Sequence, residues 1–483
     1  MKKVIAAFLF LLSFVLNAQA PKKFYTRFGG YGHDIGYGVV QTLNGQYAVT
    51  GSTSSFGNGN TDVYLALVDS MGWVRWEKSY GGFNNDIGRS IIQLKDSGFV
   101  IAGYTNSFGS GGYDVFAVRT DKNGNLIWQK AFGGFDWDFG YCVKESNGGD
   151  SLIICGNTYS FGYGKSDGYI IKTDINGNFQ WQKTYGGAED DEFKSFTLTY
   201  NNQYAFAGTT KSMGDTKGDC WLMKTNLGGD SILGVKRGDS KIQFLTDIVE
   251  ANNFDLVMSG ANDIDGRDTT YGYLLSLDNN GGFKYENTFP RSEKYNDFQL
   301  TTLTKGYGGN NFIYVYKTYE APINSKIEPL FMDVNGMWPS IFNTYGSLDN
   351  DNIVDISNTK GKGYIAVGST NGFGSQLTDV FLVKLDSTLV GSQKIVGIKE
   401  NNVETLSVEV YPTVTKDFVY VNNSTKLNSL DISVISITGS LIYTVRQDEK
   451  SYRLDLTQVP DGLYFVQISS PNQQRTFKVI KSN

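Results

Sequence analysis

The residues best suited to chemistry are aspartates that recur four positions after a repeated Gly-Gly pair. They are Asp34, Asp86, Asp138, Asp191 and Asp351. Carboxylates gathered in a ring bind Ca²⁺ or sugar hydroxyls, so these residues form a candidate binding set. The alternative is that each aspartate caps its own turn, because a residue repeated in every unit usually serves that unit. None of these loops has EF-hand spacing, so Ca²⁺ is an option and no other cofactor is expected.

Aromatic side chains are the second set of candidates. Trp137 occurs in one unit only, between two aspartates, and a unique loop tryptophan favours ligand stacking over a shared packing role. The repeated loop phenylalanines either stack on sugars or fill the gaps between units. They are Phe56, Phe108, Phe161 and Phe373. His33 is the only histidine, which excludes multi-histidine metal sites and most Ser-His or Cys-His schemes. We therefore predict no catalytic residue and no metal centre.

The elements that must position these residues come from an internal repeat. An aromatic residue followed by two glycines begins at Phe28, Tyr80, Phe132 and Tyr185, in steps of 52, 52 and 53 residues. Degenerate copies follow, and the pattern returns at Tyr345. Seven units of this length fill residues 31–396, and such a period indicates a repeat architecture.

Each unit carries four short apolar runs separated by turn residues. In the second unit they are 87–94, 99–104, 115–119 and 126–132. Because one four-stranded sheet cannot bury both of its faces, the repeat predicts an all-β fold, a seven-bladed β-propeller with four-stranded blades. Phe24–Phe28 and Gln393–Gly397 both resemble spare outer strands. One of them is expected to complete the last blade.

In such a meander, successive loops alternate between the two faces of the propeller. The Gly-Gly loops and the Ser-Phe-Gly loops therefore share one face, here called the Gly-Gly face, and the tight turns at 95–98 and 121–124 share the other. The loops of the Gly-Gly face are longer and more varied, which favours it as the binding surface.

The repeat resembles a family of bacterial and archaeal surface propellers. Their pattern runs through Ser-Phe-Gly, an Asp, a Lys-x-Asp and a Gly-x-x-x-Trp-x-Lys-x-Tyr-Gly-Gly. The third unit matches it at Ser160, Phe161, Gly162, Asp167, Lys172, Asp174, Gly177, Trp181, Lys183, Tyr185, Gly186 and Gly187. The resemblance implies the propeller fold, and it implies no single activity.

Residues 397–407 interrupt the repeat as a linker, and residues 408–483 contain seven short alternating runs that predict a small immunoglobulin-like β-sandwich. This segment resembles the type A sorting domain of the type IX secretion system of Bacteroidota. The matching residues are Tyr411, Pro412, Gly439, Gly462, Tyr464 and Lys478. The resemblance implies that the type IX secretion machinery is a partner and that the protein is secreted or held at the outer-membrane surface.

Residues 1–20 are predicted to be a signal peptide, since they combine Lys2 and Lys3 with a short apolar run and an Ala-x-Ala end. Cleavage after Ala20 or Ala18 leaves residues 21–396 as the propeller. No later stretch is apolar enough to span a membrane. The net charge of −6 and the lack of a long basic run argue against nucleic acid as a partner. Cys142 and Cys155 fall on adjacent expected strands, either as buried thiols or as a disulfide.

Three functions remain open. The first is a non-catalytic adhesion propeller that binds an extracellular glycan or protein through the Gly-Gly face. The second is a carbohydrate-active enzyme, similar to a glycoside hydrolase, that uses a carboxylate pair at the propeller mouth. The third is a structural spacer.

Overall fold

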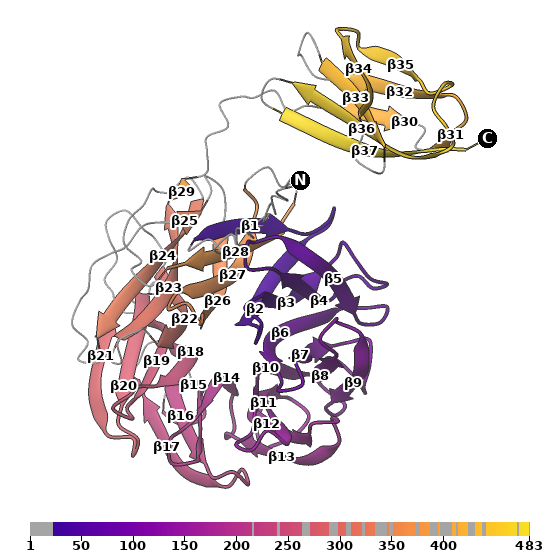
Figure 1. Ribbon diagram of the computed structural model, residues 1–483. Coiled ribbons are helices and arrows are strands. Elements are labelled where there is room, and N and C mark those ends of the chain that lie inside the picture. The colour runs from indigo at the N-terminus through magenta and orange to yellow at the C-terminus, as the bar shows by residue number, and fades with distance from the viewer. Residues whose placement is uncertain are drawn as a thin grey trace, which may run out of the picture. The chain divides into compact units, whose positions relative to one another are not determined.

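The computed structural model describes residues 23–482 except 215–216, 239–241, 263–270, 289–297, 306–310, 321–323, 334–344, 347–350, 373–376, 387–394, 397–407, 412–413, 424–429, 437–440 and 471–472. The chain forms two compact units, Met1–Gly397 and Ile398–Asn483. All regular elements in the described part are strands (Figure 1). The predicted all-β class is therefore confirmed, while residues 1–20 and the linker 397–407 lie outside the described residues.

The described part of the first unit contains seven sheets of mainly antiparallel strands arranged around an axis (Figure 1). The first three sheets are β2 (Asp34–Gln41), β3 (Tyr47–Thr53), β4 (Asp62–Val68) and β5 (Val74–Tyr80); β6 (Asp86–Gln93), β7 (Phe99–Thr105), β8 (Asp114–Thr120) and β9 (Leu126–Phe132); and β10 (Asp138–Glu145), β11 (Ser151–Thr158), β12 (Asp167–Asp174) and β13 (Phe179–Tyr185). The next two are β14 (Asp191–Leu198), β15 (Tyr204–Thr210), β16 (Asp219–Thr225) and β17 (Ser231–Arg237); and β18 (Gln243–Glu250), β19 (Leu256–Asn262), β20 (Tyr271–Leu277) and β21 (Phe283–Thr288). The sixth holds β22 (Phe298–Lys305), β23 (Asn311–Glu320), β24 (Asn324–Asp333), β25 (Tyr345–Gly346) and β29 (Ile395–Val396), and the seventh holds β26 (Asp351–Asn358), β27 (Tyr364–Thr370), β28 (Asp379–Leu385) and β1 (Phe24–Phe28).

The burial of each strand explains its sequence. Strands β3 and β4 are buried along their whole length, because both faces of their sheet are covered by neighbouring sheets. Leu65 of the first sheet and Ile101 of the second belong to one apolar cluster between the two sheets. The outermost strand β5 alternates instead between exposed and partly buried residues. Apolar runs that barely alternate thus mark the sandwiched strands.

The first and last repeats share one sheet. Strand β1 pairs antiparallel with β28 over its whole length, from Phe24 opposite Lys384 to Phe28 opposite Val380. Near the axis, Val39 of β2 donates its backbone N–H to Asp355 of β26 at 2.9 Å. Of the two spare strands in the sequence, Phe24–Phe28 therefore completes the last sheet, whereas β29 pairs in parallel with β25 of the sixth sheet.

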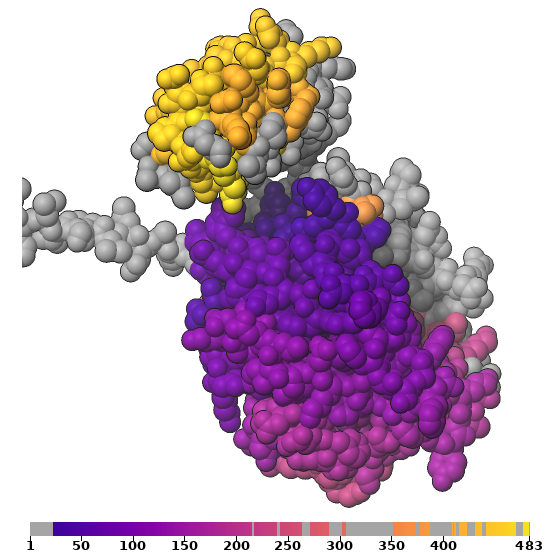
Figure 2. All heavy atoms as spheres, turned by 90° about the vertical axis from the view of Figure 1, so that its right-hand side faces the viewer, coloured from indigo at the N-terminus to yellow at the C-terminus, as the bar shows by residue number. Residues whose placement is uncertain are grey.

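Neighbouring sheets are also joined at their outer strands. The Trp128 ring of β9 packs against the turn at Gly177 in the next sheet, and Lys130 Nζ donates to Asn178 Oδ1 at 3.1 Å. Trp76 and Trp181 contact Gly124 and Gly229 in the same way. These repeated tryptophans thus join blades. In the space-filling view of Figure 2, the indigo-to-magenta sheets form one continuous packed surface.

The three cysteines are buried free thiols. Cys142 and Cys155 face each other as register partners on β10 and β11. The two cysteines lie on adjacent strands, as predicted, and they are thiols rather than a disulfide.

The second unit consists of two sheets. One contains β30 (Val408–Tyr411), β32 (Phe418–Asn423) and β35 (Ser451–Asp455), and the other contains β31 (Val414–Thr415), β37 (Gln473–Lys481), β36 (Gly462–Ser470), β33 (Leu430–Ser436) and β34 (Leu441–Gln447). Buried residues of both sheets, such as Val419 and Val466, form one core. This confirms the predicted small sandwich, with the two-residue β31 as an eighth strand that the sequence pattern missed.

Candidate binding site at the Gly-Gly face and the central channel

The repeated aspartates of the Gly-Gly face are buried inside the blades. Asp138 is fully buried, and its Oδ2 accepts hydrogen bonds from the Gly134 N–H at 2.7 Å and from Ser160 Oγ at 2.8 Å. Its Oδ1 accepts a further bond from the Thr158 hydroxyl. Asp34, Asp86 and Asp191 accept bonds from the same kinds of donor in their own units, and Asp351 is equally buried. These contacts hold the Gly-Gly loop against the Ser-Phe-Gly loop, as the capping alternative expects.

A second carboxylate lies beside four of these aspartates, Asp34, Asp86, Asp138 and Asp191. A side chain at Gly133 would meet Asp114 Oδ1 at 2.1 Å and Asp138 Oδ2 at 2.4 Å, so only glycine fits between the two acids. Burial raises the pKa of Asp114 to about 6, and the charge of Asp138 adds to the effect. The Gly-Gly pair is therefore required by the packing of the loop.

The repeated loop phenylalanines lie against rings of their own blades. Phe56 stacks on Tyr64 with ring centroids 6.0 Å apart, and Phe108 stacks on Phe116 at 5.6 Å. Phe161 contacts Tyr169 in the same position. Phe373 lies outside the described residues. These contacts are those of the packing interpretation, although Phe56 and Phe108 keep one side open to solvent.

Trp137 is different, because about half of its surface is exposed, at 52%. Its ring contacts Tyr159 edge-on at 6.4 Å and Phe139 at 6.2 Å. Phe139 in turn lies 5.6 Å from Tyr113 and is stacked parallel to Tyr141 at 6.3 Å. We call Tyr113, Trp137, Phe139, Tyr141 and Tyr159 the aromatic wall. It runs from the loops of the Gly-Gly face along β10 toward the axis.

The aromatic wall lies at the seam between the second and third repeats, since Tyr113 precedes β8 and the other four rings belong to the third repeat. The position of Trp137 is occupied by His33, Asn85 and Asp190 in the first, second and fourth units. His33 lies in its loop with Nδ1 3.2 Å from Thr378 Oγ1 of the last blade. This combination of rings at one seam between blades serves no purpose common to all blades.

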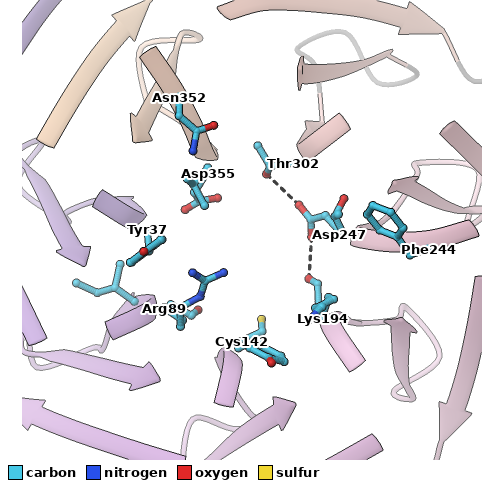
Figure 3. Close-up of a pocket in the computed structure, with 15 residues that line it drawn as sticks. Tyr37, Arg89, Cys142, Lys194, Phe244, Asp247, Thr302, Asn352 and Asp355 are labelled. Carbon is cyan, nitrogen blue, oxygen red and sulfur yellow. Dashed lines mark hydrogen bonds between the residues drawn. The ribbon is translucent and has the colours of Figure 1, made fainter. Parts of the chain in front are cut away.

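The inner strands enclose a central channel with a volume of about 480 Å³ (Figure 3). The side chains that line it occupy mainly the third and fourth positions after the strand's first residue. They include Tyr37, Arg89, Ser90, Tyr141, Cys142, Lys194, Ser195, Thr246, Asp247, Thr302 and Asp355. The sequence reasoning missed this site, since it considered only the loops.

A β-bulge in every inner strand directs these residues into the channel. The register shifts at the third position in all seven inner strands, for example between Gly140 and Cys142. A bulge turns two consecutive side chains toward the same region and frees a backbone N–H from the ladder. In six of the seven blades the residue opposite the bulge is glycine, and a side chain at Gly156 would lie 1.7 Å from the Phe139 carbonyl oxygen; the sixth blade has Tyr316 there.

The freed N–H groups are bound by the neighbouring blade. Ser90 Oγ accepts from the Val143 N–H at 3.2 Å, and Asp247 Oδ2 accepts from the Leu303 N–H at 3.2 Å. Asp247 also accepts hydrogen bonds from Ser195 Oγ at 2.7 Å and from Thr302 Oγ1 at 3.1 Å, as Figure 3 shows. The fourth position thus joins successive blades around the axis.

The charged groups of the channel have unlike surroundings. The Arg89 guanidinium lies 4.3 Å above the ring centre of Tyr37, and Lys194 Nζ lies 4.0 Å above that of Tyr141. Lys194 also pairs with Glu192 at 2.6 Å. Burial raises the pKa of Asp355 to about 7, and the charge of Asp247 contributes to the rise.

A comparison of the repeats contains the signal for this channel. At the fourth position the seven units have Gly38, Ser90, Cys142, Ser195, Asp247, Thr302 and Asp355. A position whose register is fixed but whose residue type changes from blade to blade is not held to one side chain by the packing that fixes its neighbours. Such variation distinguishes the channel lining from the constant aspartates.

The sorting residues that the structure describes lie in the second unit. Tyr411 is exposed and stacks on Tyr420 at 5.9 Å, and Tyr464 is buried with its hydroxyl donating to the Pro460 carbonyl at 2.8 Å. Gly462 begins β36, and Lys478 lies exposed on β37. Pro412 and Gly439 lie outside the described residues.

Residues 409–482 match the family described as the secretion system C-terminal sorting domain. No curated protein matches the chain. In the part of the chain that the structure describes, no helix has the length and hydropathy needed to cross a bilayer.

Solved structures with a similar arrangement are distant in sequence. PorZ, an essential surface component of the type IX secretion system of Porphyromonas gingivalis, is 12% identical with a TM-score of 0.43, and the alignment covers 90% of this chain and 58% of PorZ. A copper-bound fungal alcohol oxidase is 11% identical over 96% of this chain and 100% of its own, with a TM-score of 0.43. The polysaccharide lyase Uly1 is 10% identical over 74% of this chain and 90% of its own, also at 0.43.

The matched segment coincides with the sandwich of the second unit, and the sequence motifs and the family match agree on its nature. A domain of this family directs export by the type IX system through the periplasm. The chain is therefore an exported β-repeat protein whose C-terminal unit belongs to the family of secretion system C-terminal sorting domains and whose destination is the cell surface or the extracellular space.

Proposed function

We propose that the protein is a binding propeller that holds an extracellular glycan on the aromatic wall and in the central channel, at the surface of a member of the Bacteroidota. The observation that supports this proposal most directly is the aromatic wall. It consists of partly exposed rings in mutual contact at a single seam, between the second and third blades, and it leads from a loop surface into a cavity. Aromatic faces with polar edges suit sugar rings, which present apolar C–H faces and hydroxyl rims.

The face chosen from the sequence is kept in this proposal, but the working residues change. Trp137 remains the first candidate. The aspartates at 34, 86, 138, 191 and 351 support the loops from beneath, because their oxygen atoms are buried. Ligand contact then comes from the rings above them and from the channel residues behind them.

The proposal predicts that Trp137→Ala weakens glycan binding by at least about tenfold, the usual cost of losing a central aromatic contact. A glycan array identifies the ligand for the full chain, and calorimetry then compares the variant with the wild type. Trp73→Ala is the matched control, because Trp73 is 70% exposed on a tight turn of the opposite face. Equal affinity of all three proteins would contradict the proposal.

The carbohydrate-active enzyme is the second candidate, and a specific observation favours it. Asp247 and Asp355 both line the channel, and the pKa of Asp355 is raised to about 7. A glycosidase needs a pair of carboxyl groups of which one is protonated, and the raised pKa of Asp355 suits it to the protonated role. Shortened glycan products in the same incubations would establish this function if they disappear in Asp355→Asn. Glycans that stay intact would favour the binding propeller instead.

A protein that binds no glycan on the array would instead fit the structural spacer. Its aromatic wall would then have no ligand. The array therefore separates all three functions in one sample.

A further inference from the structure

We propose that Arg89 is an oxyanion site in the central channel and that the ligand is an acidic glycan, whose carboxylate or sulfate group binds the guanidinium. This inference rests on the proposed glycan binding and adds the charge class of the ligand. It is carried by an arginine that points into a cavity without an internal counterion.

Arg89 occupies the bulge position of β6, so its side chain leaves the strand toward the axis. Figure 3 shows its guanidinium in the open middle of the channel. Its flat face rests on Tyr37 at 4.3 Å. Among the residues placed in the structure, no carboxylate forms an ion pair with Arg89 and no acceptor receives a hydrogen bond from it. The edge of the guanidinium, which carries its five N–H donors, is left for a ligand.

The other charges of the channel already have partners. Lys194 pairs with Glu192 at 2.6 Å. Asp247 accepts bonds from Ser195, Thr302 and the Leu303 N–H. Asp355 accepts the Val39 N–H, and the pKa of about 7 leaves it largely uncharged in mildly acidic solution. The two acids of the channel are thus engaged with other donors, and in the described residues neither forms an ion pair with Arg89.

The chemistry of arginine selects the kind of anion. A guanidinium binds a planar carboxylate or a sulfate through two parallel N–H···O bonds, and stacking on a ring fixes its orientation. Tyr37 supplies that ring here. A small anion alone would leave the rest of the cavity and the aromatic wall without a role.

The position of Arg89 links the anion to the aromatic wall. Its charge acts on the phenol groups of Tyr141 and Tyr104, so the guanidinium lies close to the inner end of the wall. Tyr141 stacks on Phe139, and Phe139 contacts Trp137 at the mouth. A glycan chain lying on the wall would thus bring an acidic substituent to Arg89.

The test uses the full chain and three related probes: a galacturonic acid trisaccharide, its methyl ester and a sulfated galactose trisaccharide. We expect the acidic probes to bind at least about tenfold more tightly than the ester, and this preference to vanish in Arg89→Gln. Arg89→Lys should restore only part of it, because lysine lacks the paired donors. The two acidic probes distinguish carboxylate from sulfate as the preferred group.

Lys122→Gln is the matched control, because it removes one positive charge from an exposed turn on the opposite face. Equal weakening by Lys122→Gln and Arg89→Gln would overturn the proposal in favour of general electrostatic attraction. Equal binding of acid and ester by the wild type would also overturn it. Thermal stabilisation by sodium galacturonate that requires Arg89 but survives Trp137→Ala would support the oxyanion site while contradicting the aromatic wall, so the two proposals fail separately.

Discussion

An aspartate that recurs in five blades and one that occurs in two blades have opposite relations to the solvent. Asp138 is buried at the end of its strand, where two loops supply its hydrogen-bond donors. Asp355 faces the channel from a position where other blades have serine, threonine, cysteine or glycine. The first kind of acid stabilises loops through satisfied buried bonds, and the second kind is available for chemistry or for pH dependence.

Asp355 predicts a specific dependence of stability on pH. Because its pKa is raised to about 7 in the folded chain, against an ordinary value near 4, the folded state holds a proton that the unfolded state releases between about pH 4 and pH 7. The contribution of this proton is complete below pH 4 and is lost as the pH rises through 7. Asn resembles the protonated acid, so Asp355→Asn should gain stability relative to the wild type across that window.

The measurement is thermal unfolding followed by tryptophan fluorescence, which reports on the propeller because all seven tryptophans precede residue 397. We expect the midpoint of the variant to rise relative to the wild type by roughly 2 °C or more between pH 4.5 and pH 8. Asp136→Asn, in an exposed loop, is the charge-matched control. A constant difference across this range would refute the raised pKa.

At the scale of the element, one turn and one strand join each blade to the next. The turn at Gly177 has a φ of +72°, a conformation that glycine adopts freely, and it lies under the Trp128 ring of the preceding blade. The Tyr80 hydroxyl contributes a parallel contact one blade earlier by donating to the Gly124 carbonyl at 2.6 Å. The repeated Gly and Trp of the sequence are therefore two halves of one joint.

Gly177→Ala should destabilise the propeller by about 2 kcal/mol, because the added Cβ lies 3.0 Å from the Trp128 ring and the left-handed backbone is strained for alanine. Gly361→Ala is the control, since no atom lies within 4 Å of its added Cβ. Urea unfolding of both variants gives the comparison. A variant at Gly177 that unfolds at the wild-type urea concentration would disprove the joint.

The strands were predictable from the sequence, but the direction of the channel residues was not. In the second repeat, the four expected runs and strands β6 to β9 agree to within one residue at every end, because Gly, Asn and Asp turns bracket every run. The inner strand β6 breaks the two-residue alternation of its side chains at the bulge. A prediction from strict alternation therefore places Ser90 and its neighbours on the wrong face of the sheet. The closure by Phe24–Phe28 required a partner 352 or more residues away, which local patterns do not contain.

For the whole molecule, the proposed binding site and the sorting domain lie in different units. The sorting domain has its own core, with Val419 and Val466 both fully buried. The channel lies entirely in the first unit. Removing the second unit should therefore change where the protein goes without changing what it binds.

Deletion of residues 408–483 is expected to leave the propeller in the periplasm, because the family of the deleted domain directs the last step of export. Cell fractionation and N-terminal sequencing check this result. The retained protein should begin after Ala20 or Ala18, which tests residues 1–20 as the signal in the same sample. Full-length protein serves as the control, and surface exposure of the truncated chain would contradict the assignment.

The pairing of β1 with β28 makes the fold depend on the entire repeat region. Phe24–Phe28 gains its only ladder when Val380–Lys384 is present. Until then the earliest strand has an unpaired edge, and bringing its distant partner to it has a loop-closure cost that must precede any reward from pairing. A chain cut short before the seventh blade would keep two open edges, the kind of surface that proteases and aggregation act upon. Because β1 pairs with β28, only a chain that contains all seven blades is expected to resist proteolysis and aggregation outside the cell.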